Sequence, residues 1–396
     1  MKRVSKREKT FVKKVLKSEF RNSKRTSMVR DCEVEFADLI GCNYAIGFVN
    51  GTSTLHIALE VLGVGPGDEV IVPPLTMAAT TMAVLHTGAT PIFADVDQGT
   101  FQISALSISK LVSKNTKAII TVALYGGSPD YDAIKQAAPN IPIIEDNAEA
   151  LGTTYKGENI GNFGVMSSYS FQTSKHLTAG EGGMLCTNNS ELADRIRVLQ
   201  SLGYGSVSAT TQKIEKSTLQ DPNFNRHISL GWNYRMSELT AAVVRGQIQN
   251  ASKLIKNRIE VGKNIFELAS SYDNTKTQGI YPNSTHSFWA APLLITNPKI
   301  NWKEFANKFN TEGGKGVYAA WKLTFNESFW LDKKLLGREK TLTCLTTDTN
   351  NCPQASIIQP RILAFRTNEW DKKGKNSQIK ALEKTLKYFS NKIDYS

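Results

Sequence analysis

The sequence is poor in cysteine and histidine, with five of each among 396 residues. Cys32, Cys42, Cys186, Cys344 and Cys352 are scattered, and they form no CxxC pair or Cys/His spacing typical of a zinc site. An odd number of scattered cysteines favours a reduced, cytoplasmic setting over a disulfide framework. Because the histidines are equally dispersed, we expect no metal site.

Long hydrophobic runs are also missing from the sequence. No apolar stretch approaches the roughly 20 residues of a membrane-spanning helix, and no cationic segment followed by an apolar one opens the chain as a signal peptide would. We therefore expect no membrane partner. The 40% hydrophobic composition is still enough for a large core, and a length of 396 residues favours two domains.

Acidic residues are outnumbered by basic ones, giving a formal net charge of +12, but the excess is local. Residues 1–30 hold twelve Lys or Arg and two Glu, a charge of +10, so the other 366 residues carry only +2. The segment KREKTFVKKVLKSEF places Phe11, Val12, Val15 and Leu16 in one stripe and predicts a solvated basic helix. Three other functions are possible for this segment. It could guide a phosphorylated substrate electrostatically, target the protein to an organelle or bind nucleic acid. No helix-turn-helix or RNA-binding signature accompanies the arm, so we expect no nucleic-acid partner.

Short apolar strands alternate with helical segments between Ala45 and about Asn188. The predicted strands are AIGFV, EVIVP, TPIFADV, KAIITVALY, PIIED, VMSSYSF and GMLCT, and the predicted helices are TLHIALEVLG, AATTMAVLHTG, ALSISKLVS and YDAIKQAA. This alternation indicates an α/β fold with a mostly parallel seven-stranded sheet flanked by helices. Ligands of such sheets bind at the carboxyl ends of the strands.

The second half of the chain has a different pattern. Residues 203–231 lack periodicity and predict a long loop, which in a compact domain is usually functional or mobile. A helical stretch is expected from Ser237, a candidate cap, to about residue 272, and it leads into a smaller α+β domain. We expect a large domain over residues 1–254 and a small one over 255–396. The tail QIKALEKTLKYFSNKI predicts an amphipathic helix whose apolar stripe packs in the core.

Two residues in the first half carry the candidate chemistry. Asp146 ends the apolar run IPIIED, and Lys175 follows the strand SSYSF 29 residues later, just before a glycine-rich GEGG turn. Alone, Lys175 would be a surface lysine and Asp146 a cap or strand-end carboxylate. Together they offer an amine for a Schiff base and a carboxylate that keeps a pyridine nitrogen protonated. Two charges about 4 Å apart at an effective dielectric near 20 interact by roughly 4 kcal/mol, or about three pKa units. Strand alternation turns the neighbouring Glu145 to the other side.

A third feature is a phosphate-sized helix N-terminus. Thr52 and Ser53 stand in the segment GTST directly before LHIALEVL, where backbone N–H groups and hydroxyls collect. Ser170, five residues before Lys175, could add a hydroxyl. Serine and threonine are ordinary helix caps, so this segment is weak evidence by itself. An acid, a lysine and a phosphate site in this order predict a pyridoxal-phosphate-dependent aminotransferase.

The chain resembles the DegT–StrS family of pyridoxal-phosphate sugar aminotransferases, which have the aspartate-aminotransferase fold. The likeness is close from about Phe36 to Gly262 and thinner beyond. It rests on NGTSTLHIALEVLGVGPGDEVIVPPLTMAAT, IIEDNAEALGTTYKG, SYSFQTSKHLTAGEGGM and NYRMSELTAA. The resemblance implies ping-pong transfer of an amino group from an amino-acid donor, glutamate, to a keto sugar. A nucleotide-linked keto-deoxysugar is the expected acceptor, and a non-nucleotide cyclic ketone such as an inosose or carbocycle is the alternative.

The resemblance also implies a role for each matching residue. Lys175 would hold the cofactor covalently and move the reacting proton, and Asp146 would pair with the pyridinium nitrogen. Asn233 would reach the phosphate from the partner subunit of a homodimer. The expected phosphate ligands from the same subunit are Thr52, Ser53 and Ser170.

The sequence departs from the family pattern at several positions. Met77 stands where an aromatic ring usually covers the cofactor, and Glu149 replaces a glutamine or histidine near its phenolic oxygen. A carboxylate facing a phenolate is repulsive unless one of them is protonated. The segment EGGKGVYAAWKLTFNESFW replaces a histidine-rich substrate segment, so Trp321 and Lys322 are candidates for facing the substrate, with core packing the alternative for Trp321. Related sugar dehydratases carry histidine in place of Lys175, which argues against dehydration. A cofactor-bound regulator that uses the basic arm is the other class of function.

Overall fold

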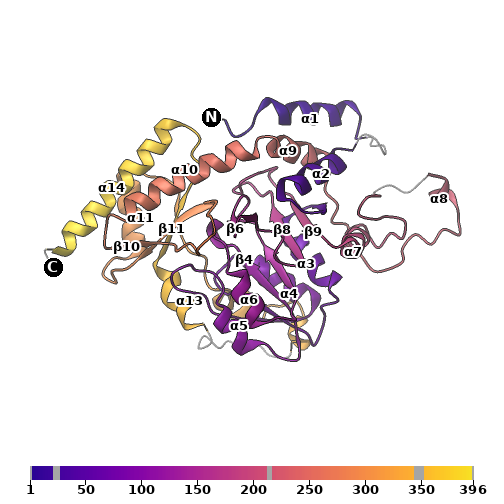
Figure 1. Ribbon diagram of the computed structural model, residues 1–396, viewed down its shortest axis with the longest axis horizontal. Coiled ribbons are helices and arrows are strands. Elements are labelled where there is room, and N and C mark those ends of the chain that lie inside the picture. Colours follow the sequence, from indigo (N-terminus) through magenta and orange to yellow (C-terminus); the bar gives the residue numbers. More distant parts are fainter. Residues whose placement is uncertain (1, 21–26, 212–215, 343–351, 395–396) are drawn as a thin grey trace.

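The computed structural model describes residues 2–20, 27–211, 216–342 and 352–394 (Figure 1). A seven-stranded sheet with the order β1-β9-β8-β5-β4-β2-β3 forms its centre. These strands are β1 (Tyr44–Phe48), β2 (Glu69–Val72), β3 (Thr90–Phe93), β4 (Thr116–Val122), β5 (Ile143–Asp146), β8 (Met166–Ser170) and β9 (Gly183–Thr187). β9 is antiparallel to both of its neighbours, whereas the pairs from β8 to β3 are parallel. The predicted α/β sheet is therefore confirmed, strand by strand.

Helices cover both faces of this sheet because its inner strands alternate apolar side chains between the two faces. Ile120 and Ile144 belong to one buried cluster with Leu55, whereas Ile119 and Ile143 belong to another. The flanking helices are α2 (Met28–Ile40), α3 (Gly51–Val61), α4 (Ala79–Thr87), α5 (Ala105–Leu111), α6 (Tyr131–Ala137), α7 (Ser190–Gln200) and α9 (Glu238–Ile248). The sequence patterns predicted α3 to α6 and the start of α9, but not α2 or α7.

A second, antiparallel sheet with the order β10-β11-β13-β12 follows in the C-terminal part. Its strands are β10 (Thr275–Thr277), β11 (Ala290–Ile295), β12 (Val317–Ala319) and β13 (Ile362–Arg366), and its helices are α10 (Ala251–Ala269), α11 (Trp302–Thr311) and α14 (Lys372–Asp394). Leu382, Leu386 and Phe389 on α14 are buried with Phe305 and Phe309 of α11, so the tail helix packs in the core as predicted. None of the helices in the described ranges is long and apolar enough to cross a lipid bilayer.

The boundary at residues 254 and 255 remains a prediction. α10 starts on the large-domain core through Leu254 and continues on the small-domain core through Ile265. Two later segments, α12 (Ser328–Leu331) and α13 (Pro353–Ile358), return to the large domain, where the Trp330 ring lies 5.2 Å from that of Phe93. A single boundary in the sequence therefore does not divide the residues of the two hydrophobic cores.

The helical stretch predicted from Ser237 to about residue 272 consists of two helices, because the chain breaks between α9 and α10. Ser237 caps α9 as predicted, accepting from the amide of Thr240. At the break, Asn250 has φ −118° and ψ 7°, outside the helical range, and the Gln249 carbonyl accepts from the Arg7 side chain. The remaining short elements are α8 (Lys216–Gln220) within the predicted long loop, the ribbon β6 (Thr154–Tyr155) and β7 (Glu158–Asn159), and the 3₁₀ turns η1 (Leu124–Gly126), η2 (Thr324–Asn326), η3 (Arg338–Lys340) and η5 (Gln359–Arg361).

The basic segment near the N-terminus forms α1 (Lys6–Lys17), which lies along α9 (Figure 1). Ser5 and Glu8 form a capping box at its start. The two helices approach closely at Gly246, where a Cβ atom would lie 2.6 Å from Glu8 Cγ. Val15 is buried, but Leu16 is 53% exposed, so the predicted apolar stripe is only partly covered.

Candidate active site

A cavity of about 400 Å³ opens where β5 and β8 end. Six of the eight predicted site residues line it: Thr52, Met77, Asp146, Glu149, Ser170 and Lys175. Ser53 and Asn233 do not. Asp146 and Lys175, which are 29 positions apart, therefore share one cavity. In the described part of the chain, no group of three His, Cys, Asp or Glu residues could hold a metal ion. Cys344 lies outside this part.

One end of the cavity is formed by the N-terminus of α3. Asn50 caps the helix, its side chain accepting from the amide of Ser53 at 2.8 Å. A Cβ atom on Gly51 would lie 3.0 Å from Ser170 Cβ, so the glycine permits the close approach of α3 to the end of β8. Thr52 and Ser170 thereby lie near each other with helix N–H groups, an arrangement that fits a phosphate.

Ser53 stays a predicted phosphate ligand, although it does not line the cavity. Its hydroxyl donates to the carbonyl of Asn50 at 2.7 Å, and the side chain is buried within the first turn of α3. The GTST segment correctly predicts a helix start, but it does not distinguish a hydroxyl that faces a ligand from one that bonds to its own backbone.

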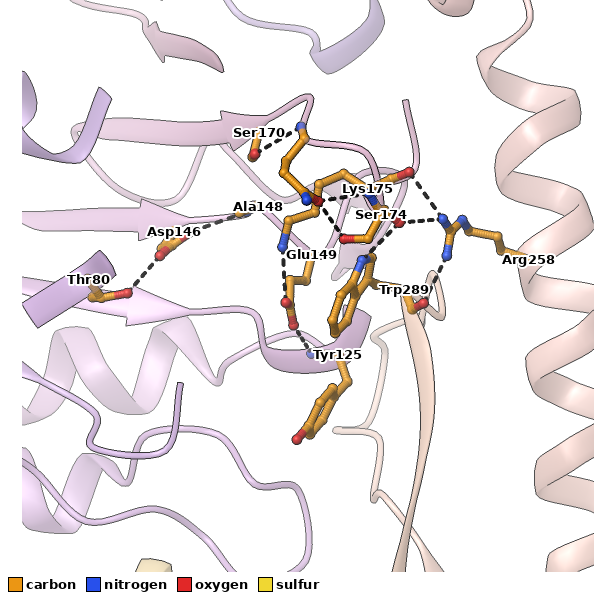
Figure 2. A network of polar contacts seen from close by, with 11 residues as sticks. Thr80, Tyr125, Asp146, Ala148, Glu149, Ser170, Ser174, Lys175, Arg258 and Trp289 are labelled. Carbon is orange, nitrogen blue, oxygen red and sulfur yellow. Dashed lines mark hydrogen bonds and ion pairs between the residues drawn. The ribbon is translucent and has the colours of Figure 1, made fainter. Parts of the chain in front are cut away.

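Asp146 is buried and held in place by two hydrogen bonds (Figure 2). One carboxylate oxygen accepts from Thr80 Oγ at 2.9 Å and the other from the amide of Ala148 at 3.2 Å. Burial raises the pKa of the Asp146 carboxyl, while these two bonds and the charge of Lys175 partly oppose that shift. A cationic ring nitrogen beside Asp146 would favour the ionised carboxylate further. The sequence reasoning did not single out Thr80, which lies two residues after PPLTMA.

The Lys175 amine lies between a carboxylate and an aromatic ring. Nζ donates to Glu149 Oε1 at 3.1 Å and lies 4.6 Å from the centroid of the Trp289 ring (Figure 2). The other oxygen of Glu149 accepts from the amide of Tyr125 at 3.0 Å. Burial raises the pKa of the Glu149 carboxyl, and the positive charge of Lys175 opposes this. The residues therefore fit a carbonyl cofactor held at Lys175, with Glu149 as a hydrogen-bonding neighbour.

Glu145 points away from this cavity, as strand alternation predicted. Its buried carboxylate accepts hydrogen bonds at 2.6–2.8 Å from three backbone amides, those of Gly161, Phe163 and Gly164. Its role is therefore to hold the turn before β8.

The opposite wall of the cavity comes from segments that the sequence reasoning largely missed. Tyr125, Trp289 and Trp321 stack nearly in parallel, with centroids 5.6–6.3 Å apart and interplanar angles of 7–15°. A second cavity of about 450 Å³ shares Trp289 and Trp321 with the first. Trp321 lines both cavities and also packs, partly buried, against the hydrophobic core, so both alternatives stay open, whereas Lys322 is exposed and lines neither cavity. No local motif marks Trp289.

The sheet, the shared cavity and the lysine–aspartate pair define a pyridoxal-phosphate-dependent enzyme of fold type I. The model of the DegT/DnrJ/EryC1/StrS aminotransferase family matches residues 2–343, and the chain belongs to this family. It is a pyridoxal-phosphate-dependent aminotransferase from a family of sugar aminotransferases. The predicted resemblance is confirmed.

Known relatives and structures agree with this assignment. The chain is 36% identical over 294 residues to GDP-perosamine synthase of Escherichia coli O157:H7, covering 73% of this chain and 75% of the relative. It is 36% identical over 273 residues to the spore coat polysaccharide biosynthesis protein SpsC of Bacillus subtilis (strain 168), covering 68% and 69%. The solved aminotransferase from Psychrobacter cryohalolentis superposes with a TM-score of 0.85 at 27% identity, covering 97% of this chain and 96% of that one.

Proposed function

We propose that the protein transfers an amino group from glutamate to a nucleotide-linked keto-deoxysugar in the biosynthesis of a surface polysaccharide or natural-product sugar. The observation that carries the proposal is the shared cavity, in which the Lys175 amine and the buried Asp146 carboxylate both face the space beside the α3 N-terminus. Support for a sugar acceptor comes from the GDP-perosamine synthases among the relatives. A cytoplasmic setting stays a prediction.

Each residue has a separate task in this proposal. Bound pyridoxal phosphate supplies an electron sink for the substrate carbon that gains or loses the amino group. Lys175 would hold the cofactor, and its amine would carry a proton to and from the substrate carbon. Asp146, oriented by Thr80, keeps the ring nitrogen protonated. The α3 N-terminus, with Thr52 and Ser170, binds the phosphate.

The aromatic wall supports a ring-shaped acceptor. Trp289 and Trp321 present flat faces where the two cavities meet, and such faces suit the C–H surface of a pyranose. Arg366 lines the second cavity and could attract the phosphates of a nucleotide, although it is also paired with Glu369. Arg366 lines only the second cavity, whereas the α3 N-terminus lines only the first, which leaves the first cavity for the cofactor.

We further propose a homodimer with shared active sites. Asn233 is exposed in the single chain and forms a bridge to Ser201 through the backbone. An exposed polar side chain in the NYRM segment is compatible with a residue that completes the site of a partner copy.

The acceptor is tested by supplying glutamate and a panel of keto compounds, with the amine product detected by mass spectrometry. The panel contains nucleotide-linked 4-keto and 3-keto deoxysugars, the corresponding free sugars and an inosose. Amination confined to the nucleotide-linked members supports the proposal. Preferential amination of the inosose would establish the alternative acceptor class instead.

Shared sites are tested by mixing two inactive variants, Lys175→Ala and Asn233→Ala. If Asn233 acts in the partner's site, hybrid dimers contain one intact site and activity partly returns. Each variant alone serves as the control. No recovery after subunit exchange, verified by sedimentation, would contradict the role of Asn233.

A further inference from the structure

The backbone around the catalytic lysine is held by two arginines from distant parts of the chain. We define the lysine loop as residues 173–175, whose three carbonyls all accept from guanidinium groups. Arg258 of α10 donates to the Ser174 carbonyl at 2.6 Å and to that of Lys175 at 3.1 Å (Figure 2). Arg3 donates to the Thr173 carbonyl at 2.6 Å and also to the Lys175 carbonyl.

Arg258 is part of the rigid interior. Its side chain is 1% exposed, and it also donates to the Trp289 carbonyl at 2.9 Å and to Thr367 Oγ at 3.2 Å. Trp289 adds a further bond, from Nε1 to the Ser174 carbonyl at 3.1 Å. Arg258 therefore joins α10, the start of β11 and the lysine loop.

Arg3 comes instead from the segment before α1, and that segment is tied to the same region. Gln247 of α9 donates to the Arg3 carbonyl at 3.0 Å and to Glu8 at 2.5 Å. The oxygen of the same Gln247 amide accepts from the amide of Thr178 at 3.4 Å, just beyond the lysine loop. The N-terminal segment thus contacts the lysine loop directly through Arg3, and Gln247 of α9 links the same segment to Thr178.

Arg3 and Arg258 both donate to the Lys175 carbonyl, and two cations this close repel each other. Burial, and next the charge of Arg3, lower the pKa of Arg258 to about 9. The Trp370 ring lies 5.8 Å from the Arg3 guanidinium carbon and 5.9 Å from that of Arg258, so its face attracts both. The three carbonyls and this ring offset the repulsion. The close approach of Arg3 to Arg258 is therefore supported by specific contacts.

We propose that residues 2–8 form a strap across the outside of the lysine loop, and that Arg3 is a positioning residue for Lys175. Arg3 fixes the two outer carbonyls of the loop, and this sets where the side chain of Lys175 begins and how far its amine reaches. The basic arm then has a role in the active site that its net charge does not reveal. The proposal rests on the proposed role of Lys175.

The experiment compares Arg3→Ala with Arg7→Ala, a matched control on the same segment. Arg7 donates to the Gln249 carbonyl and to Asn250, so it also attaches the arm but does not contact the lysine loop. Amide hydrogen exchange of residues 172–180 is measured in the full-length protein, together with kcat and KM. In Arg3→Ala we expect exchange in this segment to rise about tenfold, as for the loss of a charge-assisted hydrogen bond. We also expect kcat to fall roughly tenfold with KM within about twofold, because misplacement of a catalytic group affects turnover.

Arg3→Lys keeps the charge but cannot span two carbonyls, so exchange and kcat should return only in part. If Arg3→Ala and Arg7→Ala change exchange and kcat equally, the strap merely stabilises the fold and the proposal is overturned. Unchanged exchange in Arg3→Ala also overturns it. Borohydride fixation of the cofactor tests the proposed function separately. Labelling of a lysine other than Lys175 would contradict the proposed function, whereas amide hydrogen exchange of the lysine loop still measures the effect of Arg3.

Discussion

The two walls of the active-site cavity are built in different ways. One wall, with Thr52, Asp146 and Ser170, consists of strand ends and a helix start within a regular α/β pattern. The other wall, with Trp289 and Trp321, comes from irregular segments that flank β11 and β12. Parallel sheets bring strand ends to one edge whatever the loops do, whereas the second wall depends on how the C-terminal domain packs. We infer that the first wall supplies the common chemistry and the second one selects the acceptor.

The largest effect is expected from Lys175→Ala, which removes the amine that we propose holds the cofactor and moves the proton. Turnover should fall by at least roughly 10²–10⁴-fold, the usual contribution of a positioned acid or base. Borohydride should then fix no cofactor on the protein. Lys156→Ala is the control, because Lys156 is an exposed lysine that pairs with Asp132. Substantial turnover in Lys175→Ala would contradict the proposed role of Lys175.

Asp146→Asn should have the next largest effect, because a neutral amide cannot hold the proton on the ring nitrogen. The loss of about three pKa units of stabilisation corresponds to a fall in turnover on the order of 10²-fold or more. Thr80→Val removes only the hydrogen bond that orients Asp146 and should cost roughly threefold to tenfold. Steady-state kinetics with matched cofactor occupancy measures both. If Thr80→Val costs as much as Asp146→Asn, orientation rather than charge dominates.

The wall built from the regular α/β pattern could be predicted from the sequence, whereas the aromatic wall could not. The apolar strand before Asp146 and the strand before Lys175 are local patterns, so both residues and their shared edge were predictable. Trp289 and Arg258 were not predictable from the sequence. Each donates a hydrogen bond to Ser174 from a position more than 80 residues further along the chain. The sequence pattern also does not mark the break between α9 and α10, which lies where Arg7 donates to the Gln249 carbonyl. The role of Ser53 stays a prediction, and in this structure its hydroxyl donates to the helix backbone.

The second wall is tested with Trp289→Ala and Trp289→Phe. Loss of the ring removes the stack with Trp321 and the contact with the Lys175 amine, so KM for the keto acceptor should rise roughly threefold to tenfold, in line with about 0.5–1.5 kcal/mol for an aromatic pair. The phenylalanine variant should recover most of this. KM for glutamate serves as the internal control. An equal rise for glutamate and the acceptor would contradict a selective role for this wall.

Thr52→Ala and Ser53→Ala test the first wall at the phosphate end. Thr52 lines the cavity, so its variant should bind pyridoxal phosphate several-fold more weakly, as expected for a lost hydrogen bond to a charged group. Ser53→Ala should leave cofactor affinity nearly unchanged and instead lower stability by about 1 kcal/mol. Titration of the apoprotein with cofactor and thermal unfolding distinguish the two. Weaker cofactor binding in Ser53→Ala alone would restore the role predicted from the sequence.

The smallest effect concerns Glu149, which lies between the two walls. Burial raises the pKa of its carboxyl above 4.5, so the folded protein holds this proton more tightly than the unfolded chain does. The resulting stabilisation is fully present below pH 4.5 and is lost as the pH rises through the pKa of the folded state. In Glu149→Gln this loss disappears, so Tm should fall less steeply above that pH, by a few degrees at most. Thermal unfolding of the apoprotein from pH 4 to 8 measures the slopes, with the exposed Glu158→Gln as control. Parallel curves for the native protein and Glu149→Gln would mean that Lys175 fully compensates the burial of this carboxylate, and that the ion pair seen in the structure holds across the whole range.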